Sequence, residues 1–441
     1  MAKINGYLLI SFILLFSIVL LLINDIHLLG QVYFYSITIY TILNIYLNKK
    51  IQLIDIWNGA FVFIIVSEIL QIEFNNQNLT AAVYFLLISN NVVNIGYLHG
   101  NKRRLYIPVE KNYEKSRNNK TIVFLLIFVI VFYTFIKLPE ALYTFRVGRN
   151  VVFSQNVGQG FILTPLFDSI AYVFPAIIAY YYIYVKQKKL FIPFILSSPI
   201  FLILFLSGTR FPLLFSFLGF IIVVQAKYFI KIKFKHFILI ALLFFSLIYG
   251  AKLMAHFRST DTKNEQFLLS NKSNKTDFPT FLASTIMSNE GVVDMTSVMF
   301  DYFNHNPHLY GASTSFILYF WIPREIWPDK PTMLGNWLVR EYRGGFSDAH
   351  SASFGFTGDL YADFGLFSFV FIFFIGRLLR YADVFKEKAF KESGFNVIIA
   401  AMFFPYTFFF VRSPITATMT FIAIMFFFYI FKKLIIVGNK S

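Results

Sequence analysis

The sequence predicts an all-α polytopic membrane protein with about twelve transmembrane helices and one large extracytoplasmic loop. Of its 441 residues, 57% are hydrophobic and only 14% are charged, whereas soluble domains are about 25% charged. Many uncharged windows of about 17–22 residues are long enough to cross a hydrocarbon core about 30 Å thick. Lysines and arginines gather in alternate connections between these windows, as the positive-inside rule requires. These three observations together predict the fold class.

The predicted spans follow one another with mostly short connections. They lie near 7–24, 31–48, 53–71, 80–98, 121–137, 161–185, 190–206, 211–226, 237–254, 364–380, 395–411 and 414–431. Residues Met1–His27 lack the small-residue cleavage site of a signal peptide, so they are expected to remain as the first helix. Lys49–Lys50 and Lys186–Lys189 then face the cytoplasm, as do both termini. We expect a multi-pass protein of the cytoplasmic (inner) membrane of a bacterium, with its active site facing the periplasm or outside.

Two connections break the pattern of short loops. Leu138–Gly160 is a moderately long loop, and the segment 255–363 is an extracytoplasmic loop domain between transmembrane helices 1–9 (1–254) and 10–12 (364–441). Within that domain, residues 278–303 have the pattern of an amphipathic helix. The apolar stretch "STSFILYFWIP" is too short to span, so it is expected at the membrane interface or as a re-entrant segment. No internal repeat points to an inverted-repeat transporter.

The composition excludes several chemistries. The chain has no cysteine, which excludes disulfides, thiolate metal sites and cysteine nucleophiles. It contains no P-loop, no GxGxxG and no DxD triplet, which disfavours a soluble nucleotide-sugar donor. The "HNPH" stretch, His305–His308, has a metal-like spacing, but its proline spoils a helical pair, and we expect no metal and no cofactor. The net charge of +16 reflects membrane topology, so no nucleic-acid partner is expected.

Arginines are enriched on the predicted outer side, where orientation does not require them. Eight of about 14 basic residues there are arginines, whereas the inner side carries mostly lysines. The eight are Arg146, Arg149, Arg210, Arg258, Arg324, Arg340, Arg343 and Arg412. The planar guanidinium fork suits phosphate and carboxylate groups and keeps its charge when desolvated. The pattern therefore predicts an anionic ligand on the outer side.

Arg210, in the turn "FLSGTRFP", is the first candidate to bind that ligand. It lies where the seventh predicted span ends and the eighth begins, beside small hydrogen-bond donors, and Pro212 starts the next helix at a position that needs no N–H. A cation beside a helix N-terminus makes an anion site. The alternative is an arginine that only anchors the helix end at the interface. Arg258, in "KLMAHFRST", follows the ninth span and has the same two interpretations.

Acid–base candidates lie in the large loop. His350 lies near Asp348 in the stretch "FSDAHSASFGFTGDLYADFGLF". Histidine is the usual general base in enzymes, because it gains and loses a proton near neutral pH. Asp359 and Asp363 are four residues apart and are expected to share one face at the start of the tenth span, where the helix dipole favours carboxylates. Glu290 and Asp294 have the same spacing on the predicted amphipathic helix. For all of them, a solvated loop or helix face is the alternative.

The order of these motifs resembles the Wzy-type O-antigen and capsular repeat-unit polymerases. The resemblance rests on "SGTR" between two spans, an arginine past the next span, and "WIPREIWPDKP" followed by "HSASFGFTGDLYADFG" in the outer loop, over about residues 200–380. It implies a GT-C-like membrane glycosyltransferase that moves a growing glycan from undecaprenyl pyrophosphate to the non-reducing end of a new lipid-linked repeat unit. Membrane lipids, a chain-length regulator and a flippase are the other implied partners, in lipopolysaccharide or capsule synthesis.

The resemblance also implies roles for the candidate residues. Arg210 and Arg258 would hold the donor pyrophosphate, with Arg324, Arg340 and Arg146 as further contacts to pyrophosphate or glycan. His350 would orient or deprotonate the acceptor hydroxyl. In the related ligases an asparagine often follows this histidine, whereas Ser351 follows here, so Asp359, Asp363 and Glu290 remain alternative bases.

Two other functions fit parts of the pattern. A flippase or exporter of the same lipid-linked oligosaccharide is also basic and often has twelve spans, but alternating access usually needs short loops and charges inside the bundle. An O-antigen ligase shares the donor and differs in the acceptor. The large outer loop favours the polymerase over the flippase and does not separate it from the ligase.

Overall fold

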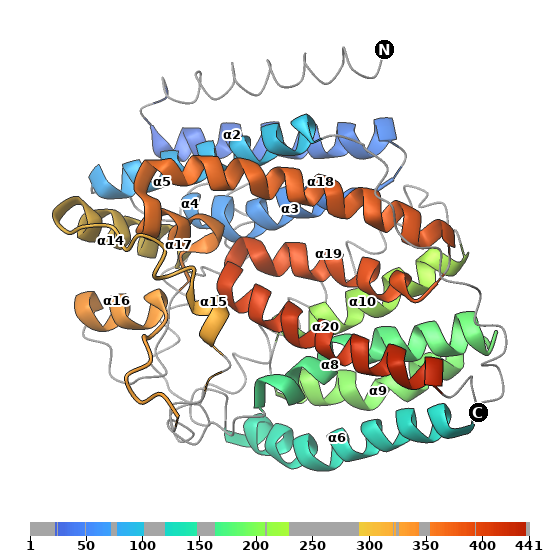
Figure 1. The fold of residues 1–441 in the computed structure, drawn as a ribbon. Helices are drawn as coiled ribbons and strands as arrows, with labels where there is room; N and C mark the ends of the chain where they lie inside the picture. Colours follow the sequence, from blue (N-terminus) through green and yellow to red (C-terminus); the bar gives the residue numbers. More distant parts are fainter. Residues whose placement is uncertain are drawn as a thin grey trace. The chain divides into compact units, whose positions relative to one another are not determined.

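The computed structural model is built from helices (Figure 1). It describes residues 25–48, 50–71, 77–100, 120–147, 164–207, 210–228, 291–320, 326–343, 353–392 and 394–437, with the single residues 23 and 322. Within these ranges every regular element is a helix and no strand occurs, which confirms the all-α class. Of the twelve predicted spans, 7–24 and 237–254 lie outside the described residues, and each of the other ten coincides with a described helix.

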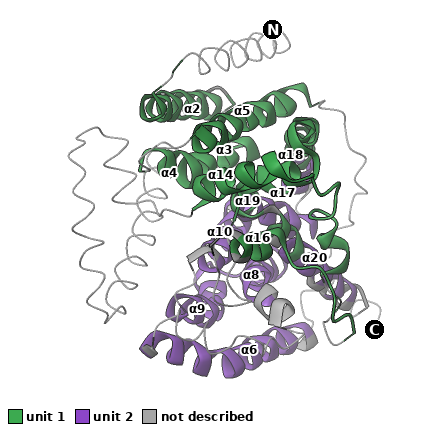
Figure 2. Ribbon diagram, turned by 90° about the vertical axis from the view of Figure 1, so that its left-hand side faces the viewer, with its two compact units in different colours: residues 1–104, 271–384, 407–419 green, residues 105–270, 385–406, 420–441 purple. Residues whose placement is uncertain are grey.

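The chain divides into two compact units, each made of several sequence segments (Figure 2). Unit 1 comprises residues 1–104, 271–384 and 407–419, and unit 2 comprises residues 105–270, 385–406 and 420–441. The three C-terminal helices contribute residues to both units: α18 (Ser368–Glu392), α19 (Asn396–Arg412) and α20 (Pro414–Val437).

Unit 1 contains the N-terminal helices and the described part of the large loop. Its long helices α2 and α5 pack with a continuous helical segment made of α3, the π-helical turn η1 and α4. The elements of this unit are α2 (Ile26–Asn48), α3 (Leu53–Phe61), η1 (Val62–Val66), α4 (Ser67–Ile69), α5 (Gln77–His99), α14 (Val292–His305), α15 (Phe316–Tyr319), α16 (Leu334–Arg343), α17 (Gly355–Phe364) and the 3₁₀ turn η5 (Gly365–Phe367).

Helices α5 and α18 approach each other closely in unit 1. A Cβ atom built on Gly96 would lie 2.1 Å from the Phe373 carbonyl oxygen, and one on Gly376 would lie 2.0 Å from that of Val93. Only glycine fits at both positions, since no backbone can yield that much space locally. Small residues that allow backbone contact are a common means of packing helices in a membrane.

Unit 2 contains a helical bundle in which α8 packs against α9 and α10, and α6 packs against α9. A buried hydrogen bond from the Ser216 hydroxyl to the Ala171 carbonyl oxygen, 2.8 Å long, joins α10 to α8. The elements are α6 (Lys120–Val147), α8 (Thr164–Tyr180), the π-helical turn η3 (Tyr181–Val185), α9 (Phe191–Leu206) and α10 (Arg210–Tyr228).

Several described helices have the length or apolar character of membrane helices. By length and composition, Ile26–Tyr46, Gln77–His99, Ile122–Arg146 and Gly355–Lys391 are able to cross a membrane. Five shorter apolar helices lie at Ile170–Val185, Phe191–Leu206, Pro212–Lys227, Asn396–Arg412 and Ala417–Ile430. Many of their large apolar side chains are exposed, including Phe135 at 80% and Phe191 at 71%. Such surfaces are characteristic of a polytopic membrane protein, because lipid tails cover them.

Three local expectations about helix boundaries are wrong. Residues Leu138–Val147 belong to α6 instead of a loop, since the helix continues through Pro139 and retains the hydrogen bond from Thr144 Oγ1 to the Glu140 carbonyl oxygen. The amphipathic helix predicted over 278–303 does not run through Gly291, whose φ of +68° makes it the N-cap of α14, and residues 278–290 lie outside the described residues. Of the predicted pair Glu290 and Asp294, the structure describes only Asp294, which lies in the first turn of α14.

The third correction concerns Asp359 and Asp363. Both lie on α17, a separate helix that ends at Phe364, and α18 begins only at Ser368. Gly365, with φ +57° and ψ −138°, separates the two helices in a conformation that requires glycine. Asp363 thus occupies the last turn of α17, where the dipole disfavours a carboxylate, and not the first turn of a helix.

Candidate functional site

The start of α14 is held by a buried carboxylate from another helix. Glu68, in α4, is fully buried directly after the π-helical turn η1. Its Oε2 accepts a hydrogen bond from the Val292 amide at 2.8 Å, and its Oε1 accepts from the amides of Val293 at 3.0 Å and Asp294 at 3.2 Å. These amides have no partner inside their own helix, and the dipole adds a favourable interaction with the negative charge. Glu68 therefore fixes where the large loop returns to the N-terminal helices.

The start of α17 lies beside the start of α14. A Cβ atom on Gly355, whose φ is +68°, would lie 3.0 Å from Val292 Cγ1 and 3.4 Å from the Val411 carbonyl oxygen. Two residues earlier, the Ser353 hydroxyl donates a short hydrogen bond to the Arg412 carbonyl oxygen at the end of α19. The starts of α14 and α17 and the end of α19 thus meet in unit 1.

The far end of α17 binds the loop between α14 and α15. Asp363 is fully buried and accepts hydrogen bonds from the backbone amides of Ser313 at 2.9 Å and Thr314 at 2.8 Å. Asp359 Oδ1 accepts a hydrogen bond from the Ser313 hydroxyl at 2.9 Å. In the opposite direction, the amides of Leu309 and Tyr310 donate to the last carbonyl oxygens of α17, at 2.9 and 3.0 Å. Helix and loop therefore form one hydrogen-bonded assembly.

The two carboxylates of α17 are not equivalent. Both oxygens of Asp363 are used by backbone amides, which explains how a buried acid is stable at a helix C-terminus. Asp359 is partly exposed, and its Oδ2 accepts no hydrogen bond from the described part of the chain. Asp359 thus has one carboxylate oxygen left to accept a further hydrogen bond.

His308 packs next to these groups. Its ring stacks on Phe303 at 5.4 Å and meets Tyr361 edge-on at 5.5 Å. Its buried Nδ1 has no hydrogen-bond partner among the described residues, and a Cβ on Gly365 would lie 2.6 Å from its Nε2. His305 points elsewhere, toward the Asp301 carbonyl oxygen at 2.9 Å. In the described ranges, no three His, Asp or Glu side chains gather as metal ligands.

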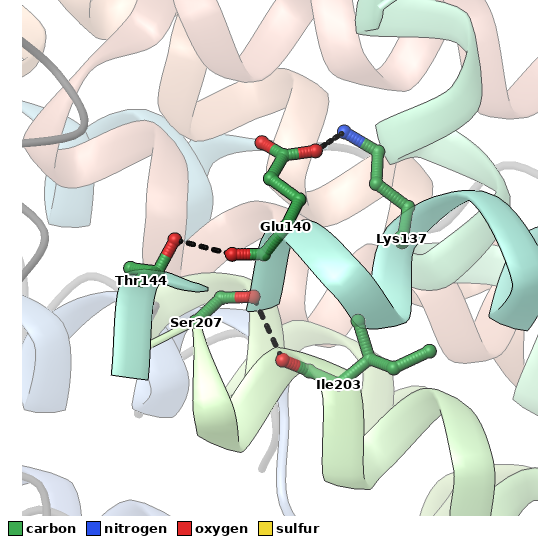
Figure 3. A network of polar contacts seen from close by, with 5 residues as sticks. All are labelled: Lys137, Glu140, Thr144, Ile203 and Ser207. Atoms are coloured by element: carbon green, nitrogen blue, oxygen red, sulfur yellow. Dashed lines mark hydrogen bonds and ion pairs between the residues drawn. The ribbon is translucent and has the colours of Figure 1, made fainter. Parts of the chain in front are cut away.

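Two predicted ligand arginines belong to unit 2. Arg146 lies in the last turn of α6 and is exposed, and Arg210 is the first residue of α10, directly after the turn that ends α9. Figure 3 shows the C-terminal part of α6, with Glu140 and Thr144, beside the last turn of α9, with Ile203 and Ser207. The two helices run in the same direction there, so Arg146 and Arg210 lie at the same end of unit 2.

Polar contacts within each helix stabilise that end. Lys137 and Glu140 form an ion pair at 3.1 Å on either side of Pro139, and the Ser207 hydroxyl donates to the Ile203 carbonyl oxygen at 2.8 Å (Figure 3). The Thr144 and Ser207 hydroxyls both donate to the carbonyl oxygen four residues earlier in their own helix. Pro212 lies at the third position of α10, still within the turn that needs no N–H.

The predicted site residues are therefore only partly brought together. Asp359 and Asp363 share the face of α17 that contacts Ser313, and Arg340 lies in α16. His350, Glu290, Arg258 and Arg324 lie outside the described residues. The sequence interpretation missed Glu68, Ser313 and Thr314. Glu68 carried a signal, since an acid within an apolar span is costly unless it has partners, whereas Ser313 and Thr314 carried none.

Comparison with known proteins gives the same family as the motifs. The family described as "O-antigen polysaccharide polymerase Wzy" matches residues 6–327. Two proteins called O-antigen polymerase, from Salmonella typhimurium strain LT2 and Salmonella typhi, are each 27% identical over 407 residues, covering 85% of this chain and 86% of the relative. No solved structure matches. Because the match extends over most of the sequence, the resemblance is confirmed, and this chain belongs to the O-antigen polysaccharide polymerase Wzy family.

Proposed function

We propose that this protein polymerises lipid-linked oligosaccharide repeat units on the outer face of the bacterial inner membrane. It transfers the nascent glycan from undecaprenyl pyrophosphate to the non-reducing end of an incoming repeat unit that is still attached to its own carrier lipid. The proposal includes a metal-independent, GT-C-type glycosyltransferase with twelve spans and both termini in the cytoplasm. Family membership supports polymerisation in general. The side chains described above support separate roles, with a carboxylate for the acceptor hydroxyl and arginines for the donor pyrophosphate.

The observation that carries the acceptor side is the Asp359–Ser313 pair. A general base must present an unoccupied oxygen to the hydroxyl it deprotonates. Asp359 has such an oxygen, while its hydrogen bond to the Ser313 hydroxyl, 2.9 Å long, fixes the orientation of the carboxylate. Asp363 holds the loop that supplies Ser313, so it acts as a positioning residue. His350 and Glu290 remain alternative bases, and they adjoin in sequence the junction of α14 and α17.

The donor side is assigned to arginines. The leaving group is a pyrophosphate, so the reaction needs cations at the departing oxygens and no dedicated acid. Arg210 and Arg146 lie at one end of unit 2, and Arg258, Arg324 and Arg340 are further candidates on sequence grounds. Guanidinium groups bind phosphate oxygens in pairs and remain charged when water is removed.

The chemical step is a single displacement. The acceptor hydroxyl oxygen forms a bond to the anomeric carbon of the donor glycan while the bond from that carbon to the pyrophosphate oxygen breaks. The hydroxyl proton passes to the base, and undecaprenyl pyrophosphate leaves with the electron pair. A single displacement predicts inversion at the anomeric carbon.

A strain that lacks this gene tests the proposal. We expect surface glycan capped with a single repeat unit, restored to a ladder of lengths by the wild-type gene and not by Arg210→Ala. Arg149→Ala, a second outer arginine with no assigned role, is the matched control and should restore the ladder. Repeat units that never reach the outer face would instead indicate a flippase, and long polymer retained on the carrier lipid would indicate a ligase. Either result would overturn the proposal.

A further inference from the structure

An apolar groove runs along α9 and α10 within unit 2. Its volume is about 560 Å³, within the range of roughly 300–1,000 Å³ that is typical of ligand pockets. The lining includes Phe194, Phe201, Leu202 and Phe205 of α9, and Leu213 and Phe217 of α10. From Phe194 to Phe205 the groove follows α9 for about 16 Å, at 1.5 Å per helical residue.

Local sequence explains why α9 is hollow on this side. Ser198 and Pro199 lie in the middle of the groove and contribute little side-chain volume beside four phenylalanines. Pro199 has no N–H to donate to the carbonyl of residue 195, and the Ser198 hydroxyl donates to that Ile195 oxygen instead, at 2.8 Å. The backbone therefore stays satisfied in an apolar surrounding while the groove remains open.

Aromatic contacts set the width of the groove. The ring of Phe201 meets that of Phe217 edge-on, with centroids 5.5 Å apart, and this contact holds α9 against α10. Leu202 and Phe194 remain about half exposed, at 52% and 45%. Exposed apolar side chains on a membrane helix face lipid, so the groove is open to a long hydrocarbon chain and too apolar for a sugar.

Two arginines lie in the chain near one end of the groove. Arg210 begins α10 three residues before the lining residue Leu213, and Phe205 lies on the last turn of α9. Arg146, exposed at the end of α6, lies at the same end of unit 2. A ligand with an anionic head and a long apolar tail matches this combination.

We propose that the groove binds the polyprenyl tail of a lipid-linked repeat unit, with its diphosphate held at the Arg210 end. The proposal rests on the function proposed above and adds the position of the tail. A methyl-branched, unsaturated chain makes dispersion contacts with the faces of the phenylalanines. The tail moves into the groove from the lipid phase and not from water, so the hydrophobic effect does not favour binding. The shape of the groove and the nearby arginines would instead select the polyprenyl lipid over other membrane lipids.

Photo-crosslinking tests this assignment with two matched positions. A benzophenone amino acid replaces Leu202, in the groove, or Phe128, which is 55% exposed on α6 and does not line it. The full-length protein is placed in vesicles of phosphatidylethanolamine and phosphatidylglycerol that contain tritiated undecaprenyl diphosphate. One charge-assisted contact to the diphosphate corresponds to about tenfold in occupancy, so Leu202 should be labelled roughly tenfold more than Phe128. A benzophenone at Phe205 gives a second groove position if the first variant does not fold.

The outcomes separate this inference from the proposed function. Unlabelled undecaprenyl diphosphate should abolish the labelling at Leu202, and Arg210→Ala should reduce it, whereas added phosphatidylglycerol should do neither. Equal labelling at Leu202 and Phe128, competition by phosphatidylglycerol, or a crosslink to a second copy of the chain would each overturn the groove assignment. Crosslinking measures binding and not polymerisation. A protein that is labelled selectively but makes no polymer would refute only the proposed function. A protein that polymerises without selective labelling at Leu202 would refute only the groove assignment.

Discussion

Replacing Glu68 by alanine should release α14 from the N-terminal helices. The fully buried carboxylate makes two hydrogen bonds of 2.8 and 3.0 Å and a longer one of 3.2 Å to consecutive backbone amides. A hydrogen bond to a charged group contributes about 1.5–3 kcal/mol, so loss of the two shorter bonds costs about 3–6 kcal/mol. Glu68→Gln should lower the free energy of unfolding by less than Glu68→Ala. The amide oxygen of the glutamine still accepts a hydrogen bond, although its NH₂ group replaces the second acceptor.

Hydrogen exchange in detergent micelles measures this effect where it occurs. The amides of Val292 and Val293 should lose protection in Glu68→Ala by several orders of magnitude, and the apparent free energy of unfolding should fall with them. The matched control is Glu140→Ala, which removes a carboxylate that is 51% exposed and paired with Lys137 on α6. Such a surface pair contributes about 0–1 kcal/mol. If Glu68→Ala behaves like Glu140→Ala in both measurements, the capping role of Glu68 is wrong.

Two further pairs of substitutions separate packing from chemistry. Gly96→Ala should destabilise the protein by about 1–3 kcal/mol, since its Cβ would meet the Phe373 carbonyl oxygen at 2.1 Å, while Gly59→Ala, with open space around it, should stabilise α3 by about 0.5–1 kcal/mol; equal melting temperatures would contradict the close α5–α18 contact. Asp359→Asn should lower polymerisation about 10²–10⁴-fold at an unchanged melting temperature, whereas Asp363→Asn should lower the melting temperature. Full polymer length in Asp359→Asn would remove this residue from the list of bases.

The fold was predictable from the sequence wherever hydrophobic length decides the structure. Apolar windows located the helices from α2 to α10 and from α18 to α20, because a membrane leaves few alternatives to a helix. The predicted helix boundaries were wrong where a single proline or glycine decides the backbone conformation. A loop was predicted from Leu138, but Leu138–Val147 lies inside α6. Gly291 and Gly365 start or end helices through positive φ values that no hydrophobic pattern contains.

The site was less predictable because its contacts join distant segments. The spacing of Asp359 and Asp363 correctly indicated one shared face, yet their partner Ser313 is 46 and 50 residues away. Nothing in a serine within "GASTS" indicates a carboxylate partner, so only the structure distinguishes the fully buried Asp363 from the partly exposed Asp359. Glu68 and Val292 are likewise 224 residues apart, although an acid within an apolar span was reason enough to look for its partner.

Polar residues in unit 1 either hold helices together or keep an oxygen for a further partner, and their hydrogen bonds show which of the two applies. Asn94 and Asn58 exchange amide hydrogen bonds of 3.0 Å in both directions, and Asn90 accepts from Trp57 Nε1 at 2.8 Å, so side-chain hydrogen bonds tie α5 to α3. In a membrane, apolar burial does not drive helices together, and each such interhelical bond contributes about 0.6–2 kcal/mol while fixing the rotation of the helices. The oxygens of these amides are buried and already accept hydrogen bonds, and an amide is not a base. Asp359 is instead a partly exposed carboxylate, and one of its oxygens accepts no hydrogen bond from the described residues. For this reason we propose catalysis at α17 and a scaffold role for the amides of α5.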